Sequence, residues 1–401
     1  MQLFSSLRHP PFAWLLVGQT ISRLGDSFYR IALAWWVLEV TGSATAMGTV
    51  LIFTSAPMLI FLLFGGVAVD RFSRTRVMLA SDLGRGVVVG IVALLAFGQR
   101  LELWHIYVAS IVFGFVDAFF QPAFTALVPE VAPPGALTSA NSMTSLSERL
   151  AGVVGPALGA VIVGVSGTSA AFLLDGTTFF LSAICLIPVL PLSTRAVKGK
   201  ASMLRDLGEG INTVRYLPWL WITIVIASVS NITVGSVAGV AMPFLVKDHL
   251  QTDVRTLGWI YSTISIGSVL AAIWLGQRQK ISHRGWTIYL SLIVTGTGML
   301  IFGLSTSLIG TLGAAFISGC SLSIIGLVWL NTLQEQIPRN QLGRVASIDM
   351  LGSFVLLPVG YGIIGWMTDL MGAASIFILG GVVTVGLALV GLTHPAIRGL
   401  D

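Results

Sequence analysis

The side chains that could do chemistry in this sequence are charged residues that interrupt long apolar runs. In "GQTISRLGDSFYRIALAWW", a glutamine and three charged residues follow one another at intervals of four, three and four positions. They are Gln19, Arg23, Asp26 and Arg30. Residues three and four apart are neighbours on a helix surface, so this spacing places all four on one face. A polar stripe of this kind is suited to lining an aqueous path.

Asp26 lies at the centre of the stripe. An arginine one helical turn away on each side favours its ionised form. We therefore expect Asp26 to bind a ligand or to serve as a structural charge rather than to carry a proton. The alternative is a buried ion-pair triad of Arg23, Asp26 and Arg30 that only fixes helix packing.

A second polar face runs through "ASIVFGFVDAFFQPAF". Its members are Ser110, Gly114, Asp117 and Gln121. Asp117 has no basic residue within one turn of sequence, and removal from water then favours the protonated carboxyl. We predict Asp117 as the proton site. The alternative is a pair with an arginine from another helix, such as Arg23 or Arg30.

Further polar and aromatic residues are candidates for the same path. Glu148, in "SLSERLAGVVGP", is a third acidic candidate for proton coupling or substrate charge, and it could instead form part of a gate. Tyr29 and Phe120 lie on the two polar segments and, with Gln19 and Gln121, are expected to line a cavity for a bulky amphiphilic ligand. Aromatic residues near helix ends are also typical of interfacial belts.

The elements that position these residues are membrane helices. Of the 401 residues 55% are hydrophobic and only 10% are charged, whereas a soluble globule needs about a quarter charged. Twelve apolar segments are each long enough for a helix across a bilayer. They lie roughly at 12–38, 45–69, 76–98, 103–128, 139–165, 170–190, 217–246, 255–276, 285–304, 308–333, 344–369 and 373–393. The predicted fold class is an all-α integral membrane protein in two six-helix bundles.

The distribution of lysine and arginine predicts the orientation. If the N-terminus is cytoplasmic, sixteen of these residues fall in inner loops and tails and three in outer loops. Basic residues collect on the cytoplasmic side of membrane proteins, so both termini are expected there. This asymmetry accounts for the net charge of +5 without a nucleic-acid partner.

The chain divides at its longest polar connection. We expect a first bundle at 1–190, a cytoplasmic linker with an amphipathic helix at 191–216, and a second bundle at 217–401. At an offset of 205 residues several positions of the two halves match, and Asp26 falls on Asn231. The matches favour two parallel repeats and make Asn231 a candidate cavity residue.

Other chemistries find little support. The two cysteines lie in apolar runs without a histidine at ligand spacing, so neither a metal site nor a disulfide framework is indicated. No P-loop, HExxH or GxSxG occurs, so we expect no cofactor and no catalytic residues. A membrane-embedded lipid-processing enzyme is a remote alternative.

The loop "GGVAVDRFSRTRVML" resembles motif A of the major facilitator superfamily, although Ser73 stands where a second glycine is usual. The matching residues are Gly66, Asp70, Arg71, Arg74 and, displaced, Arg76. The resemblance implies a cytoplasmic latch that holds the two halves together when the cavity opens outward. The alternative is a plain stop-transfer cluster of charges.

The stretch "GVVGPALGA" resembles motif C, the glycine-proline signature of antiporters in the same superfamily. The matching residues are Gly155, Pro156 and Gly159, and the proline predicts a kink. The arginine of motif B, present in proton-coupled members, is missing from the segment that carries Asp117.

Four further stretches carry a finer resemblance, to the branch of macrolide efflux proteins and the enterobactin exporter. They are "LGDSFYRIALAWWVLEVTGSATAMG", "QPAFTALVPEVAPPGALTSANSM", "VVGPALGAVI" and "LQEQIPRNQLGRVASIDM". The resemblance implies a proton-coupled exporter of drugs or amphiphilic metabolites, working by alternating access as a monomer in a bacterial inner membrane. The alternatives are a siderophore or metabolite exporter, a lysophospholipid flippase and an uncoupled facilitator.

Overall fold

The computed structural model describes residues 5–133, 135–192, 211–278 and 281–401. For residues 63–71, 192 and 339–340 it describes the backbone alone. The linker residues 193–210, where the sequence predicts most of an amphipathic helix, lie outside the described part of the chain.

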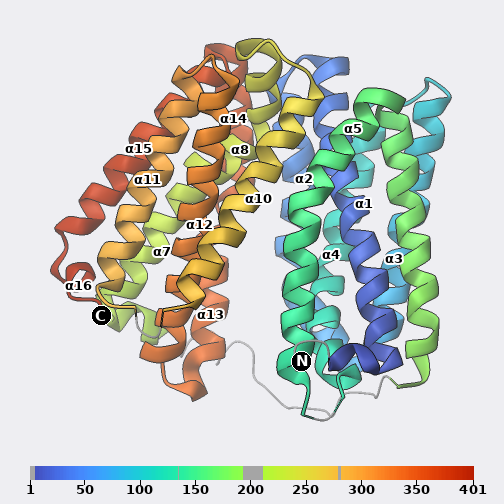
Figure 1. The fold of residues 1–401 in the computed structure, drawn as a ribbon, viewed down its shortest axis with the longest axis horizontal. Coiled ribbons are helices and arrows are strands. Elements are labelled where there is room, and N and C mark those ends of the chain that lie inside the picture. The colour runs from blue at the N-terminus through green and yellow to red at the C-terminus, as the bar shows by residue number, and fades with distance from the viewer. Residues whose placement is uncertain (1–4, 134, 193–210, 279–280) are drawn as a thin grey trace. The chain divides into compact units, whose positions relative to one another are not determined.

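Long helices make up the first half of the chain (Figure 1). They are η1 (Ser6–Arg8), α1 (Pro10–Thr41), α2 (Ala44–Arg71), α3 (Arg74–Phe97), α4 (Leu103–Val131), α5 (Leu137–Leu186) and η2 (Ile187–Leu192). Two prolines begin α1, where a missing amide hydrogen costs nothing, and Gly42 ends it with a φ of 59°.

The second half is also helical but more interrupted. Its elements are α7 (Pro218–Ser230), η3 (Asn231–Ser236), α8 (Val237–Val240), α9 (Met242–Phe244), η4 (Leu245–His249), α10 (Val254–Gly276), α11 (Arg284–Leu304), α12 (Leu308–Gln336), α13 (Arg339–Phe354), α14 (Leu357–Met371), α15 (Ala373–Thr393) and α16 (Pro395–Arg398). Both η3 and η4 are π-helices, and Pro218–Val240 still forms one helix long enough to cross a membrane, with a π-helical segment from Asn231 to Ser236.

The fold-class prediction of an all-α membrane protein is confirmed. In the described part of the chain, 10 helices are long and apolar enough to cross a membrane. The difference from the twelve predicted segments arises at two places. Gly167, with a φ of 82° that suits glycine, bends α5 into two limbs (Figure 1), and the 32-residue α1 carries the charged stripe and is not among the 10.

The helices form two compact units. Unit 1 comprises Met1–Gly42, Thr49–Gly199 and Asp253–Ser262. Unit 2 comprises Ser43–Gly48, Lys200–Thr252 and Thr263–Asp401. The candidate cavity described below lies within unit 1.

Helices of unit 1 pack through small residues. Helix α1 lies along α5, and α3 packs on α5 and α4. A Cβ added to Gly155 would lie 2.6 Å from the Cβ of Ser27, and one added to Gly176 would lie 3.3 Å from the backbone nitrogen of Gly90. Glycine therefore permits the close backbone approach that drives helix association in lipid.

Unit 2 is organised around α11, which packs on α15 and α12. Asp369 of α14 accepts hydrogen bonds from the amides of Ala44 at 2.6 Å and Thr45 at 2.9 Å, and from the Ser43 hydroxyl at 2.8 Å. A carboxylate at this place satisfies the free amides at the start of α2 and complements the helix dipole.

The two units contain an equivalent ion pair. Arg74, the first residue of α3, binds Glu130 near the end of α4. Arg284, the first residue of α11, binds Glu335 near the end of α12. The same arginine-glutamate pair at the same place in each unit supports the prediction of two parallel repeats.

Candidate functional site

A polar cavity of about 390 Å³ lies in unit 1 among α1, α3, α4 and α5, with Leu51 and Thr54 from α2 in its wall. The structure brings all the candidate cavity and charge residues of the first half together here. They are Gln19, Arg23, Asp26, Tyr29, Arg30, Asp117, Phe120, Gln121 and Glu148. The polar face of α1 and the polar face of α4 therefore open into one space.

Arg23 is paired across the cavity wall with Glu148 of α5, at 2.6 Å. Its guanidinium also lies 4.9 Å from the ring centre of Phe124. Arg30, at the other end of the stripe, is exposed and donates to the Ser27 hydroxyl at 3.2 Å. Neither arginine contacts Asp26 directly, as the alternative of an ion-pair triad would require.

Asp26 faces the cavity without a direct partner. In the described part of the chain it has no hydrogen bond or ion pair, although Arg85, Arg30 and Arg23 all lie within electrostatic range. Its carboxylate is therefore open to a ligand. The positive charges around it offset part of the cost of holding it at membrane depth.

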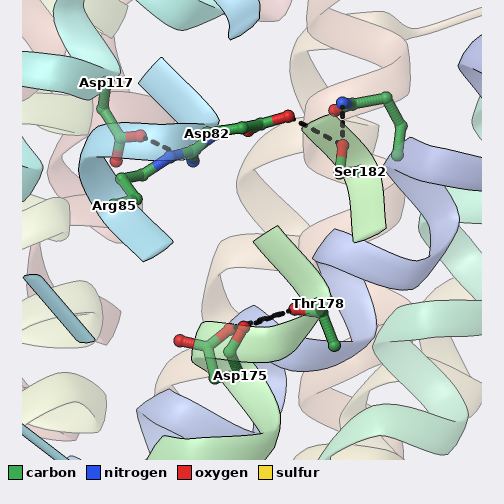
Figure 2. A network of polar contacts seen from close by, with 7 residues as sticks. Asp82, Arg85, Asp117, Asp175, Thr178 and Ser182 are labelled. Carbon is green, nitrogen blue, oxygen red and sulfur yellow. Dashed lines mark hydrogen bonds and ion pairs between the residues drawn. The ribbon is translucent and has the colours of Figure 1, made fainter. Parts of the chain in front are cut away.

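Arg85 of α3 is the central cation of the site. It binds Asp82 at 2.7 Å and Asp117 at 3.3 Å, and its own side chain is only 4% exposed (Figure 2). Its guanidinium also lies over the rings of Phe120 and Phe179, at 4.2 and 4.6 Å. Two carboxylates and two aromatic faces thus hold one buried positive charge.

A chain of hydrogen bonds continues from Asp82 away from Arg85. The Ser182 hydroxyl donates to Asp82 at 2.7 Å (Figure 2). The Gln19 amide donates to the Ser182 oxygen at 3.0 Å. Gln19 lines the cavity, so this chain connects the cavity with the buried Arg85–Asp82 pair.

Asp117 is paired with an arginine from another helix, which was the alternative to an unpaired proton site. The arginine is Arg85 rather than Arg23 or Arg30. The contact is longer than that of Asp82, and the Asp117 side chain is 30% exposed toward the cavity. Asp117 shares a cation that a closer carboxylate already neutralises. Protonation of Asp117 therefore sacrifices less attraction than protonation of Asp82 would.

Aromatic side chains form the apolar part of the wall. Tyr29 stacks on Phe113 with ring centres 5.2 Å apart, and its ring lies 5.5 Å from that of Phe172. Tyr29, Phe113 and Phe120 all line the cavity. Charged groups and aromatic faces together suit an amphiphilic ligand.

Sequence reasoning did not select Asp82 and Arg85, or the buried Asp175 of α5, which is not among the residues that line the cavity. Arg85 was visible as a charge inside an apolar segment, and Asp82 lies three positions before it, the spacing of a helical ion pair. Asp175 is the only charged residue in "LLDGTTFF". A lone acid within a membrane segment is the one sequence signal that could have identified it as a candidate.

Asn231 lies in a separate cavity of about 320 Å³ within unit 2. It opens the π-helix η3, and its side-chain amide donates to the backbone carbonyl of Ser353 at 2.8 Å. Among the described residues that line this cavity, none is charged. π-helical segments are frequent at functional sites.

The residues that resemble motif C lie in α5 against α1. A Cβ on Gly159 would come within 3.0 Å of the Phe28 Cα, so both Gly155 and Gly159 serve close packing. The non-helical backbone of α5 falls at Gly167, and the kink expected at Pro156 stays a prediction. Pro156 keeps helical dihedrals but has no amide hydrogen, which leaves the Gly152 carbonyl at the cavity wall without its helical donor.

The residues that resemble motif A are described only in part. The side chains of Asp70 and Arg71 lie outside the described part of the chain, as does the packing around Gly66, so the latch stays a prediction. Arg74 contacts the Ala126 carbonyl at 3.1 Å in addition to Glu130, and Arg76 is exposed. No group of three or more His, Cys, Asp or Glu side chains in the described part could hold a metal ion.

Apolar helices that surround a charged, aromatic-lined cavity define a class of protein, the multi-pass membrane transporter. The chain belongs to the transmembrane secretion effector family of the major facilitator superfamily, whose model matches residues 1–381. It is a transporter and not an enzyme, as the sequence predicts.

Curated relatives resemble the chain over nearly its whole length. It is 25% identical to the multidrug efflux pump Tap of Mycolicibacterium fortuitum, over 99% of this chain and 98% of that protein. It is 22% identical to macrolide efflux protein A of Streptococcus pyogenes, over 97% of each. An uncharacterized MFS-type transporter of Bacillus subtilis, YfiS, is 24% identical over 94% of this chain and 91% of that protein.

Solved structures show the same fold. The nucleoside transporter NupG superposes with a TM-score of 0.74 at 11% identity, over 96% of this chain and 98% of that chain. A bacterial homologue of the iron transporter ferroportin, in an inward-facing state, gives a TM-score of 0.73 at 16% identity, over 97% and 100%. At these identities the likeness concerns the fold alone.

Proposed function

We propose that this protein exports drugs or related amphiphilic compounds in exchange for protons. The observation that supports it best is the cavity of unit 1, where charged and aromatic side chains from α1, α3, α4 and α5 converge at membrane depth. Such charges are costly in a bilayer and are typical of substrate and proton paths. Similarity to a multidrug efflux pump and a macrolide efflux protein supports drugs as the substrate class.

Different residues of the cavity have different roles in this proposal. Asp26, which has no direct partner in the described part of the chain, receives a polar or charged group of the substrate. Tyr29, Phe113 and Phe120 contact its apolar body. Asp117 accepts the coupling proton, because it is exposed to the cavity and its Arg85 contact is the longer of two.

The proposed orientation and assembly are those expected from the sequence. The protein acts as a monomer in the inner membrane of a bacterial cell, with both termini in the cytoplasm. Alternating access of the two repeats moves the substrate outward, and the motif A residues act as the cytoplasmic latch.

A drug-susceptibility panel tests the export function. The chain is expressed in an efflux-deficient bacterial host and challenged with macrolides, cationic dyes and iron-chelating siderophores. We expect increased tolerance of at least one macrolide or dye, with loss of this tolerance in the Asp117→Asn variant at equal expression. If expression of the chain changes the host's tolerance of no compound, or of a siderophore alone, drug export is contradicted.

A further inference from the structure

The carboxyl of Asp175 is buried and poorly satisfied. Asp175 lies on the second limb of α5 and is 0% exposed. Its Oδ1 receives the Thr178 hydroxyl at 3.5 Å, but that hydroxyl lies closer, at 2.7 Å, to the Asp175 backbone carbonyl. Its Oδ2 has no hydrogen-bond partner, and Figure 2 shows this second oxygen pointing away from Thr178.

Helix α1 covers this carboxyl closely. A Cβ added to Gly25 would lie 2.6 Å from the Asp175 Oδ1, so only glycine fits at this position of α1. The next residue of α1 is Asp26, which lines the cavity. Asp175 is therefore separated from the cavity wall by the backbone of one helix.

Charged groups of the neighbouring helices do not neutralise Asp175 by contact. Asp26, Arg85 and Arg30 lie within electrostatic range of it. Arg85 is bound by Asp82 and Asp117, and Arg30 donates to Ser27. Asp175 itself has no ion pair in the described part of the chain, and the nearby acid Asp26 repels an anion there.

The hydroxyl of Tyr29 is a second unsatisfied group in the same place. It is buried without a hydrogen-bond partner and lies within electrostatic range of Asp175. The Tyr29 ring lines the cavity. A hydroxyl can both donate and accept a proton, so this side chain is suited to pass protons between the cavity and the buried carboxyl.

An ionised carboxylate in these surroundings would cost several kcal/mol, because it has lost water without gaining a cation or enough donors. We infer that Asp175 carries a proton in the resting protein and is a second proton-binding site behind the cavity. Arg85 binds Asp82 and Asp117 directly, and Asp26 lies within electrostatic range of both Arg85 and Asp175, so a neutral Asp175 avoids one further negative charge beside these acids.

The role of this proton in transport depends on the proposed function. In each cycle Asp175 gives its proton to the cytoplasmic side and takes up another from the outside, so that only O–H bonds form and break. The substrate moves in the opposite direction. The presence of the bound proton does not depend on antiport.

Infrared spectroscopy of the purified full-length protein tests the bound proton. Protonated carboxylic acids have a carbonyl band that shifts in heavy water. We expect Asp175→Asn, a neutral side chain of the same shape, to remove one such band, which Asp117→Asn leaves in place. Thr178→Val keeps Asp175 but removes a hydroxyl beside it, and should shift the same band. If Asp175→Asn keeps every protonated-carboxyl band of the wild type, the assignment is overturned, whatever the spectrum of Thr178→Val.

Transport of radiolabelled erythromycin in proteoliposomes tests the role in coupling, if the wild type accumulates it under a pH gradient. Asp175→Asn should then still exchange erythromycin at equal pH on both sides. Under the pH gradient it should accumulate at least tenfold less erythromycin than the wild type. Wild-type accumulation in this variant would overturn the coupling role. Absence of gradient-driven accumulation in the wild type would instead contradict proton antiport, and the infrared band would still decide whether Asp175 holds a proton.

Discussion

Arg85 determines the electrostatics of the candidate site at the residue scale. It neutralises Asp82 at 2.7 Å and contacts Asp117 at 3.3 Å, while two aromatic rings cover its guanidinium. Each acid of the site consequently has a different environment. Asp82 is firmly paired, Asp117 is shared and accessible, and Asp26 is open to a ligand.

Replacement of Arg85 should destabilise the protein strongly. Arg85→Met would leave the buried Asp82 carboxylate without its cation, at a cost of about 3–5 kcal/mol. Thermal unfolding in detergent would show a lowered midpoint, and addition of Asp82→Asn should recover part of the loss because the unpaired charge is removed.

Arg100→Ala, at an exposed position, serves as the control and should leave the midpoint unchanged. If Arg85→Met were as stable as the control, the Arg85–Asp82 pair would have no structural role.

Sequence reasoning located the polar faces at this scale but not their pairing. Helical spacing groups Gln19, Arg23, Asp26 and Arg30 correctly on the face that lines the cavity. The partners of Arg23 and Asp117 come from other helices, and their choice depends on the rotation and height of those helices. The spacing of residues along one helix does not determine how a neighbouring helix is rotated or how far it is shifted along its axis.

At the scale of elements, glycines set the distance between α1 and α5. Gly155 and Gly159 of α5 face Ser27 and Phe28 of α1, and Gly25 of α1 faces Asp175 on the other limb of α5. Both limbs therefore approach α1 closely. The cavity-lining charges of α1 owe their position to this packing.

Gly155→Ala should disturb that packing. The added methyl group would lie 2.6 Å from the Ser27 Cβ and Oγ, which requires a helix shift that costs about 1–3 kcal/mol. We expect a lower midpoint of thermal unfolding together with weaker binding of a transported drug.

The control is Gly313→Ala in α12, where a Cβ would meet nothing within 4 Å. This variant should be at least as stable as the wild type, since alanine favours a helix over glycine. Equal stability of both variants would mean that the α1–α5 contact tolerates a larger distance.

Sequence patterns predicted the helices better than their interruptions. Long apolar runs are sufficient for a helix in a bilayer, where every backbone group needs an internal partner. The bend at Gly167 and the π-helix at Asn231 depend on local backbone geometry. Pro156 is the residue at which the sequence predicts a kink. A proline can keep helical dihedrals within a long helix, as Pro156 does here.

At the scale of the whole molecule, two units share one plan but differ in chemistry. Each has an arginine at the start of one helix bound to a glutamate near the end of the next. The described cavity lining of unit 1 carries six charged residues, whereas that of unit 2 carries none. Proton exchange in the proposed cycle therefore belongs to the first unit.

The family and fold class can be predicted from the sequence because superfamily motifs and hydropathy extend over nearly the whole chain. The substrate was out of reach, since relatives with the same fold carry different compounds and a cavity of charges and aromatic rings fits many amphiphiles. The latch at Asp70 likewise stays a prediction, because its side chain lies outside the described residues.

In the proposed function a pH gradient drives export through the cavity of unit 1. The most direct measurement is uptake of radiolabelled erythromycin into inverted proteoliposomes with an imposed pH gradient, acidic inside, with and without the ionophore nigericin. If the gradient drives export, the wild type accumulates erythromycin and nigericin abolishes the accumulation, whereas Asp117→Asn binds the drug without accumulating it. Equal uptake with and without the gradient, or full accumulation by Asp117→Asn, would rule out proton-driven export through this cavity.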